Sequence, residues 1–189
     1  MTRQGETTLN IALIHHPVVN KRGEVIGSAV TNLDIHDIAR TSRTYGIAEY
    51  FIATPYSDQQ DLVKDLLSHW ATGHGSTYNP ARKEALSIVR LVASLEETLD
   101  ALIKKYGRKP LVVVTSAILR PTTVGYKEIS ERIGNNEPIL LLFGTAHGLA
   151  PEILALADAI LPPIQGGTTY NHLSVRSAAA IIIDRLLGS

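Results

Sequence analysis

Short segments rich in apolar residues recur along the chain, and polar, glycine or proline residues follow each one. They span residues 9–14, 48–54, 86–92, 111–115, 139–143 and 159–161. Near-continuous apolar runs of this length predict strands buried on both faces of a sheet. Pro17 and Pro55 follow the first two segments and set limits to them, because proline cannot donate to a strand ladder.

Segments with helical spacing of apolar residues lie between these predicted strands. The clearest is 94–106, where Leu95, Leu99 and Leu102 recur at helical spacing and Gly107 follows. We expect further helices from an Asp34 cap to Tyr45, from Ser57 or Asp58 to Trp70, from Arg82, over 126–133 and 149–157, and from Asn171 onward. Helices alternating with buried strands predict an α/β fold with a mostly parallel sheet and helices on both faces. One domain over 1–189 accounts for the chain.

Composition narrows the class of protein. Hydrophobic residues make up 44% and charged residues 19%, which is typical of a globular domain. There is no cysteine, which excludes disulfides and thiolate metal ligands. The polar opening lacks the features of a signal peptide, and the longest apolar run, 178–183, is too short to span a membrane. We expect a soluble, cytoplasmic protein that does not bind a membrane.

Charge is balanced overall and uneven along the chain. The formal net charge is zero, yet 16 of the 18 basic side chains precede Gly134. A polyanionic partner is therefore expected to meet the first two thirds of the chain.

Three predicted strands in the second half run directly into loops of small residues. These are Ser116-Ala117 after the first, 144–148 after the second and 162–167 after the third. In parallel sheets the ligand crevice lies beyond the carboxyl ends of the strands. None of the loops has the GxxxxGK[ST] or GxGxxG pattern, which disfavours a kinase or a dinucleotide-dependent oxidoreductase.

Three motifs together resemble those of the SPOUT (α/β-knot, SpoU/TrmD-like) RNA methyltransferases. They are HDIARTSRTYG near the N-terminus, FGTAHGL in the middle, and LPPIQGG followed by YNHLSVRSAAA near the end. Together with HWATGHGSTYNPAR, they are most similar to a bacterial subfamily of predicted S-adenosylmethionine-dependent RNA methyltransferases. The resemblance implies a C-terminal deep trefoil knot, which ordinary α/β chains avoid. It also implies a homodimer.

The same resemblance implies that backbone loops hold S-adenosylmethionine. The expected cofactor residues are Thr115, Ser116, Ala117, Phe143, Gly144, Thr145, His147, Gly148, Leu161, Pro162, Ile164, Gly166, Asn171, Leu173, Ser174 and Val175. Such loops offer the apolar walls and backbone donors that adenine needs. Asn171 and Ser174 are equally explained as caps of the last helix.

Arg40 matches the arginine that the family places near the transferred methyl group. Because arginine stays protonated, we expect it to clamp a phosphate and orient the acceptor rather than abstract a proton. Asp37 either pairs with Arg40 one helical turn away or faces the cofactor as a general base. The chain departs from SpoU-type members at Asp34, where they place asparagine, and at Ala146-His147, where they place an acidic residue.

Several polar and aromatic residues are candidates for contact with RNA. Tyr78 can stack on a base, and arginine side chains can meet phosphates. The candidates are His15, His16, Arg43, Tyr78, Asn79 and Arg82. The seven histidines show no metal-ligand spacing, so no metal is expected. For Trp70 we favour packing against the core.

The sequence thus predicts an S-adenosylmethionine-dependent methyltransferase acting on a nucleotide in tRNA or rRNA. One alternative is a non-catalytic RNA-binding protein that retains the cofactor pocket. Another is an unrelated nucleotide-binding α/β enzyme of the flavodoxin type. The sequence leaves open which RNA and nucleotide are modified, whether a ribose oxygen or a base nitrogen accepts the methyl group, and which residue acts as any general base.

Overall fold

A computed structural model describes residues 7–73, 77–120 and 124–188. Its centre is a six-stranded sheet in the order β5-β4-β1-β7-β6-β8, in which every neighbouring pair is parallel. The strands are β1 Leu9–Ile14, β4 Tyr50–Ala53, β5 Val89–Val92, β6 Leu111–Val114, β7 Ile139–Gly144 and β8 Ala159–Ile160. All six lie within the apolar segments that the sequence indicates, apart from one further residue at the end of β7.

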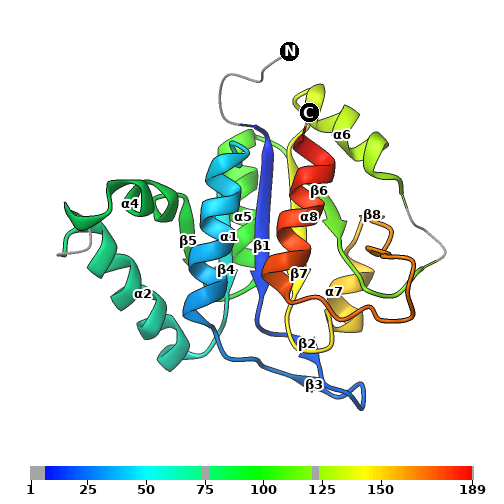
Figure 1. Ribbon diagram of the computed structural model, residues 1–189, viewed down its shortest axis with the longest axis horizontal. Coiled ribbons are helices and arrows are strands. Elements are labelled where there is room, and N and C mark those ends of the chain that lie inside the picture. Colours follow the sequence, from blue (N-terminus) through cyan, green and yellow to red (C-terminus); the bar gives the residue numbers. More distant parts are fainter. Residues whose placement is uncertain (1–6, 74–76, 121–123, 189) are drawn as a thin grey trace.

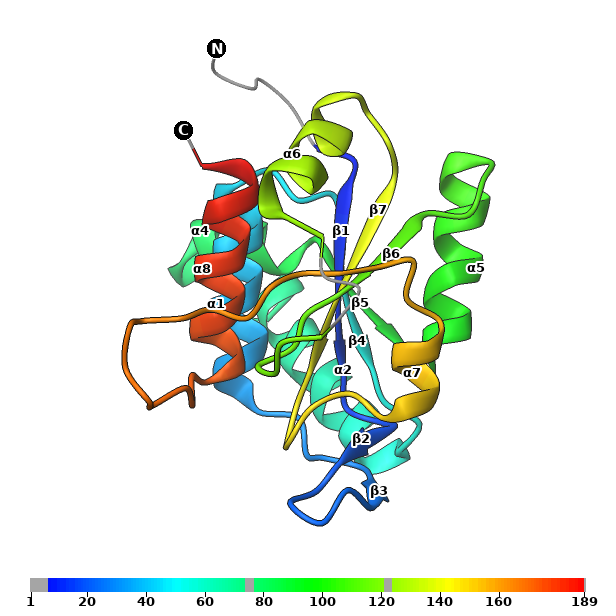
Figure 2. The same cartoon turned by 90° about the vertical axis from the view of Figure 1, so that its right-hand side faces the viewer.

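Helices cover both faces of the sheet, as predicted. They are α1 Asn32–Thr44, α2 Ser57–Ala71, α4 Pro80–Leu86, α5 Leu95–Tyr106, α6 Tyr126–Gly134, α7 Pro151–Ala155 and α8 Val175–Leu187. Helices α1 and α8 lie side by side on one face, and α5 and α7 lie on the other (Figures 1 and 2). Helices α2 and α4 lie beside α1, on the side away from α8 (Figure 1). The fold class inferred from the apolar pattern is therefore confirmed.

The hydrophobic core is divided between these two faces. Along β1, Ile11 and Leu13 pack toward α1 and α8, whereas Ala12 and Ile14 pack toward α5 and α7. Because side chains alternate along a strand, a fully buried strand must be apolar at consecutive positions. This explains why β1 and β7 read as unbroken apolar runs.

A small antiparallel hairpin follows β1 at the carboxyl edge of the sheet. It consists of β2 Val18–Val19 and β3 Val25–Ile26, and Gly23 takes a positive φ of 78° in its turn. A left-handed backbone of this kind favours glycine.

Four predicted helix starts differ from the structure. Helix α7 begins at Pro151, two residues after the predicted start, and is capped by Ala150. Helix α1 is capped by Thr31, whose hydroxyl accepts from the Asp34 backbone N–H, so Asp34 lies in the first turn and is not the cap. Helix α4 is capped by Asn79 and begins at Pro80, ahead of Arg82. Helix α8 begins at Val175, and the segment from Asn171 to its cap is not helical.

Candidate functional site

The three loops singled out in the sequence start at one edge of the sheet. Strands β7, β6 and β8 are consecutive neighbours and parallel, so their carboxyl ends lie together. Beyond them run residues 115–117, 144–148 and 161–166. Figure 2 shows the segment after β8 passing in front of the segment after β6 before it reaches α8. The sheet topology therefore brings together the loops on which the cofactor prediction rests.

The loop after β7 is anchored to the hairpin. The backbone N–H of Val19 donates to the Gly148 carbonyl at 2.9 Å, and that of His147 donates to the Val19 carbonyl at 3.0 Å. Within the loop, Ala146 and Gly148 have positive φ angles of 51° and 115°. The hairpin thus holds a turn that places backbone groups at the strand end.

A chain of side chains supports the same loop from behind. The Thr145 hydroxyl donates to the Ile14 carbonyl at 3.0 Å and shares a hydrogen bond with the Ser28 hydroxyl. The Ser28 hydroxyl also lies 3.1 Å from Nδ1 of His15, which is fully buried. Burial lowers the pKa of His15 to about 4, only partly offset by the nearby Asp34 carboxylate. His15 is therefore neutral at ordinary pH and holds Ser28 beneath the loop.

The loop after β8 contacts the loop after β6. The Asn171 side-chain amide donates to the Ala117 carbonyl at 3.0 Å, and the Tyr126 hydroxyl donates to the Pro162 carbonyl at 3.1 Å. Asn171 therefore joins the two loops through a hydrogen bond and does not cap the helix. Ser174 is the cap, since its hydroxyl accepts from the Ser177 backbone N–H.

Several of the expected cofactor residues have side chains that are buried or hydrogen-bonded within the fold. The Phe143 and Leu161 side chains are buried in the core. The Thr115 hydroxyl donates to the Leu142 carbonyl at 2.9 Å. In contrast, Leu173 is 47% exposed, and Leu119, which follows the first loop and is not one of the expected cofactor residues, is 66% exposed. Exposed apolar side chains beside loops of backbone donors and acceptors fit a ligand with a planar apolar ring and polar edges.

Helix α1 carries both residues expected on the acceptor side, and they face different neighbours. Asp37 lies 3.6 Å from Arg176 of α8, and Arg176 also meets the largely buried Asp34 at 3.3 Å. Arg40 is exposed and lines a groove between α1, α2 and α4. Among the ion pairs of the described residues, Asp37 is joined to Arg176 and not to Arg40. The simple pairing of Asp37 with Arg40, offered as an alternative, is therefore not found.

Sequence reasoning missed Arg176 and Ser28. Arg176 follows the α8 cap closely and joins the helix after the third loop to the helix that carries Arg40. The feature of the sequence that could have indicated this role is the position of Arg176 near the start of the last helix, two residues after the cap. Ser28 gave none, because a serine in a polar loop is unremarkable until the fold brings it against Thr145.

The residues proposed for RNA contact fall into different environments. The buried His15 side chain has no surface to offer RNA in this conformation, and His16 beside it is half-buried. Arg43 pairs with Glu84 through two hydrogen bonds of 2.8 and 3.0 Å. Of the remaining residues, Arg82 lines the groove and lies over Trp70 at 4.9 Å, Tyr78 is 80% exposed, and Asn79 caps α4. Trp70 packs partly against the core, as favoured, and also lines the groove.

The described part of the chain, residues 7–73, 77–120 and 124–188, contains neither a metal-ligand cluster nor a membrane-spanning helix. Within it, no group of three or more His, Asp or Glu side chains is arranged to hold a metal ion. The helices described there are also too short or too polar to cross a membrane.

Comparison with known proteins gives the family. A family described as SAM-dependent RNA methyltransferase matches residues 8–188. A protein of Oleidesulfovibrio alaskensis named tRNA (guanine-N(1)-)-methyltransferase is 49% identical over 180 residues, which are 95% of this chain and 42% of that protein. The chain thus spans less than half of that relative. An uncharacterised protein of Aquifex aeolicus is 41% identical over 177 residues, covering 93% of this chain and 86% of its own length.

A solved structure supports the fold. The SpoU methyltransferase AviRb from Streptomyces viridochromogenes, in complex with the cofactor AdoMet, aligns with a TM-score of 0.58 at 17% identity. The alignment covers 96% of this chain and 60% of AviRb. At this identity the likeness concerns the fold alone, whereas the family match extends over nearly the whole chain. This chain belongs to the SAM-dependent RNA methyltransferase family.

Proposed function

We propose that this chain transfers a methyl group from S-adenosylmethionine to a nucleotide in RNA. The observation that carries the proposal is the convergence of three loops at the carboxyl ends of β7, β6 and β8, in a chain whose family match covers residues 8–188. S-adenosylmethionine supplies a methyl group activated on a sulfonium. What the protein must add is position, because an in-line displacement depends mainly on alignment of acceptor and donor.

The proposed cofactor site is the edge formed by residues 115–117, 143–148, 161–166 and 171–175. Backbone groups of these loops would meet the polar edges of adenine and ribose, and Leu173 would pack against the ring. Two hydrogen bonds keep the loops in place before binding. One runs from the Asn171 amide to the Ala117 carbonyl, and the other joins the Ser28 and Thr145 hydroxyls. Preorganisation of this kind lowers the cost of ordering the site around a ligand.

On the acceptor side we assign Arg40 to phosphate clamping and orientation of the nucleotide. A guanidinium matches phosphate oxygens through two parallel hydrogen bonds and does not give up its proton. Asp37 remains a candidate base, although its ion pair with Arg176 also gives it a structural role.

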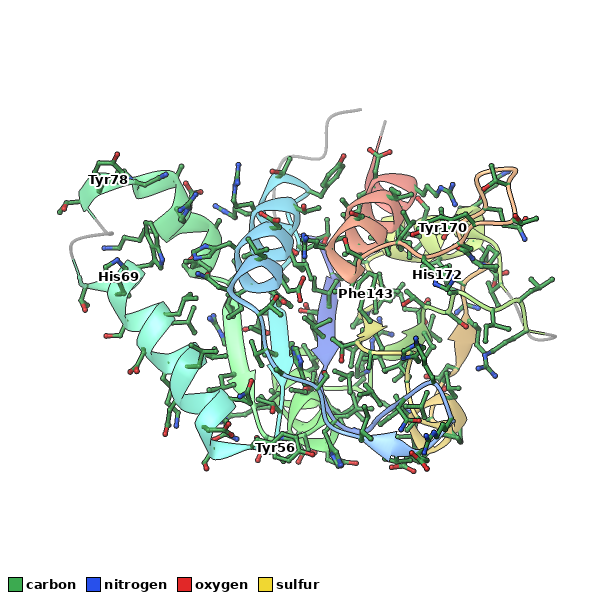
Figure 3. All side chains as sticks on the ribbon, turned by 60° about the horizontal axis from the view of Figure 1, so that its bottom comes forward. Tyr56, His69, Tyr78, Phe143, Tyr170 and His172 are labelled. Atoms are coloured by element: carbon green, nitrogen blue, oxygen red, sulfur yellow. The ribbon has the colours of Figure 1, made fainter. Side chains whose placement is uncertain are left out.

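The proposed enzyme is a homodimer. Arg40 lines the groove on the α2 and α4 side of α1, whereas the proposed cofactor loops lie beyond α8 (Figures 1 and 3). An acceptor held by Arg40 would therefore meet the cofactor of a second copy more readily than that of its own chain. We further propose that the segment before α8 threads through the loop after β6 as a trefoil knot. The contacts of Pro162 with Tyr126 and of Asn171 with Ala117 support this path.

As substrate we propose tRNA, on the strength of the Oleidesulfovibrio relative. That name belongs to the whole relative, of which this chain corresponds to 42%, so the modified position is not taken over from it. The test is methyl transfer from radiolabelled S-adenosylmethionine to unfractionated bacterial tRNA and to rRNA, with cofactor affinity measured separately by calorimetry. Transfer to rRNA alone would replace tRNA as the substrate. Cofactor binding without transfer to either RNA would favour the non-catalytic alternative.

Arg40→Ala tests the assignment of roles. We expect unchanged cofactor affinity and loss of transfer; transfer at the wild-type rate would remove Arg40 from the mechanism. Leu173→Asp should instead abolish cofactor binding, because it places a charge against the proposed ring site. If the sites are shared between copies, mixing the two inactive variants should restore part of the activity. No recovery, despite confirmed exchange of subunits, would place Arg40 and the cofactor loops within one chain.

A further inference from the structure

A groove that is open to the surface lies beside Arg40. It lies between α1, α2 and α4 and has a volume of about 580 Å³. That volume falls in the range of roughly 300–1,000 Å³ typical of small-molecule sites. Figure 3 shows His69 at the end of α2 with Tyr78 close by, far from Phe143, Tyr170 and His172. The groove is therefore distinct from the proposed cofactor edge.

Two imidazole rings and one guanidinium surround Trp70 in this groove. His36 and His69 meet its ring edge-to-face, with centroid distances of 5.5 and 5.4 Å, and the Arg82 guanidinium lies 4.9 Å from its centroid. These side chains come from three different helices, so the cluster is a product of the tertiary fold. Aromatic faces combined with guanidinium groups are the surface on which unpaired bases stack.

Two nitrogens in the cluster are buried without partners. Among the described residues, neither Nδ1 of His36 nor Nε of Arg82 makes a hydrogen bond. Leaving a buried polar group unpaired costs about 1–3 kcal/mol. Burial and the neighbouring Arg82 both lower the pKa of His36, so its ring favours the neutral state. A neutral imidazole can donate or accept a hydrogen bond at the edge of a base.

The charges of the groove suit a phosphate-bearing ligand. Arg40 and Arg82 face two carboxylates, Asp37 and Asp65, and Asp37 is paired with Arg176 of α8, a cation that it shares with Asp34. Among the ion pairs of the described residues, none involves Arg40. The guanidinium of Arg40 is thus left to meet an anion. A bound protein segment would need a longer apolar surface. A single nucleotide needs an aromatic surface for its base, a hydrogen-bonding partner for the edge of the base, and a cation for its phosphate.

We propose that this groove binds one unpaired nucleotide of the RNA, with its base against the Trp70 cluster and its phosphate on Arg40. The inference rests on the proposed RNA methyltransferase function and adds the place where the strand is held. His36 and Arg82 supply the hydrogen-bonding edge, and the exposed Tyr78 lies where the strand leaves the groove.

Trp70 provides a direct readout, because it is the sole tryptophan of the chain. Its emission is titrated with unfractionated bacterial tRNA in wild type and in Arg82→Met, which keeps the apolar stem and removes the cation. The matched control is Arg185→Met, since Arg185 lies over Tyr126 at 5.3 Å outside the groove. We expect saturable quenching, a dissociation constant raised about tenfold in Arg82→Met, and no change in Arg185→Met.

A second variant, His69→Ala, changes an exposed side chain, so the test remains valid if Arg82→Met fails to fold. Circular dichroism confirms that each variant is folded. Equal tRNA affinity in wild type, Arg82→Met and His69→Ala would overturn the inference. The inference would also be overturned if tRNA did not quench Trp70 emission although the same protein preparation methylated that tRNA. The proposed function would stand in that case. If S-adenosylmethionine binds but tRNA is neither bound nor methylated, both fail.

Discussion

The buried histidine beneath the second loop should make this protein sensitive to acid. His15 is 0% exposed, and its pKa falls from an ordinary value of 6.5 to about 4 in the fold. In the unfolded chain the ring takes up a proton below about pH 6.5, whereas the folded protein holds it neutral until about pH 4. The unfolded state therefore binds more protons in this window, and stability falls as the pH is lowered through it.

The size of the effect follows from the two pKa values. One pKa unit corresponds to about 1.4 kcal/mol, so protonation of His15 should reduce the free energy of unfolding by about 3 kcal/mol across the window. That is a large part of the roughly 5–15 kcal/mol by which domains are stable. Because the folded protein keeps His15 neutral until about pH 4, its cofactor affinity should stay constant over this window and decline only as the pH approaches 4, where the support of Ser28 under Thr145 is lost.

The assay is urea unfolding followed by circular dichroism between about pH 7 and pH 4.5. His15→Asn keeps a polar atom near the position of Nδ1 but cannot be protonated. We expect it to be less stable than wild type at neutral pH and to lose much less stability on acidification. His16→Asn, which changes the half-buried neighbour, should retain the wild-type slope. Parallel loss of stability in wild type and His15→Asn would refute the reasoning, because other groups would then carry the acid response.

Three further outcomes test other parts of the structure. Arg176→Met should lower the free energy of unfolding by about 1–3 kcal/mol, because the buried Asp34 carboxylate loses its cation. Arg176→Lys keeps a cation and should lower the free energy of unfolding by less, which urea titration of the two variants can measure. Gly144→Ala should weaken S-adenosylmethionine binding in calorimetry, since the new Cβ would lie 2.8 Å from a backbone nitrogen of its own loop; unchanged affinity would show that the loop yields easily. Arg82→Met should raise the pKa of His36 in an NMR titration, because one of the two main causes of its lowering is removed.

The sequence located the strands and the three loops that follow them well, because the evidence for these features is local. A buried strand must be apolar at successive positions, and the residues after it must be small if backbone is to meet a ligand. Both properties appear in unbroken stretches, such as 139–148, and the parallel arrangement of strands then places the three loops at one edge. The order of neighbours, β7-β6-β8, was not evident in the sequence, and the structure supplies it.

The helix starts were predicted less accurately, because several residues near each boundary can act as the N-cap of the helix. Thr31 and Asp34 are both good caps, and the buried ion pair with Arg176 explains why Asp34 lies inside α1 instead. Asn171 was read as the start of α8, but its amide is used 54 residues away on Ala117. Capping is a local property, and tertiary contacts decide between candidates of similar local merit.

What the sequence determined by itself was the α/β class, the strands and the three loops at their ends, because hydrophobic periodicity and backbone conformation are encoded in neighbouring residues. Only the tertiary structure decided that Arg176 joins α8 to α1, that His15 supports Thr145 through Ser28, and that Trp70 gathers Arg82 and two histidines into a groove. Each of these contacts joins side chains from separate elements, which only the packing of those elements can bring together.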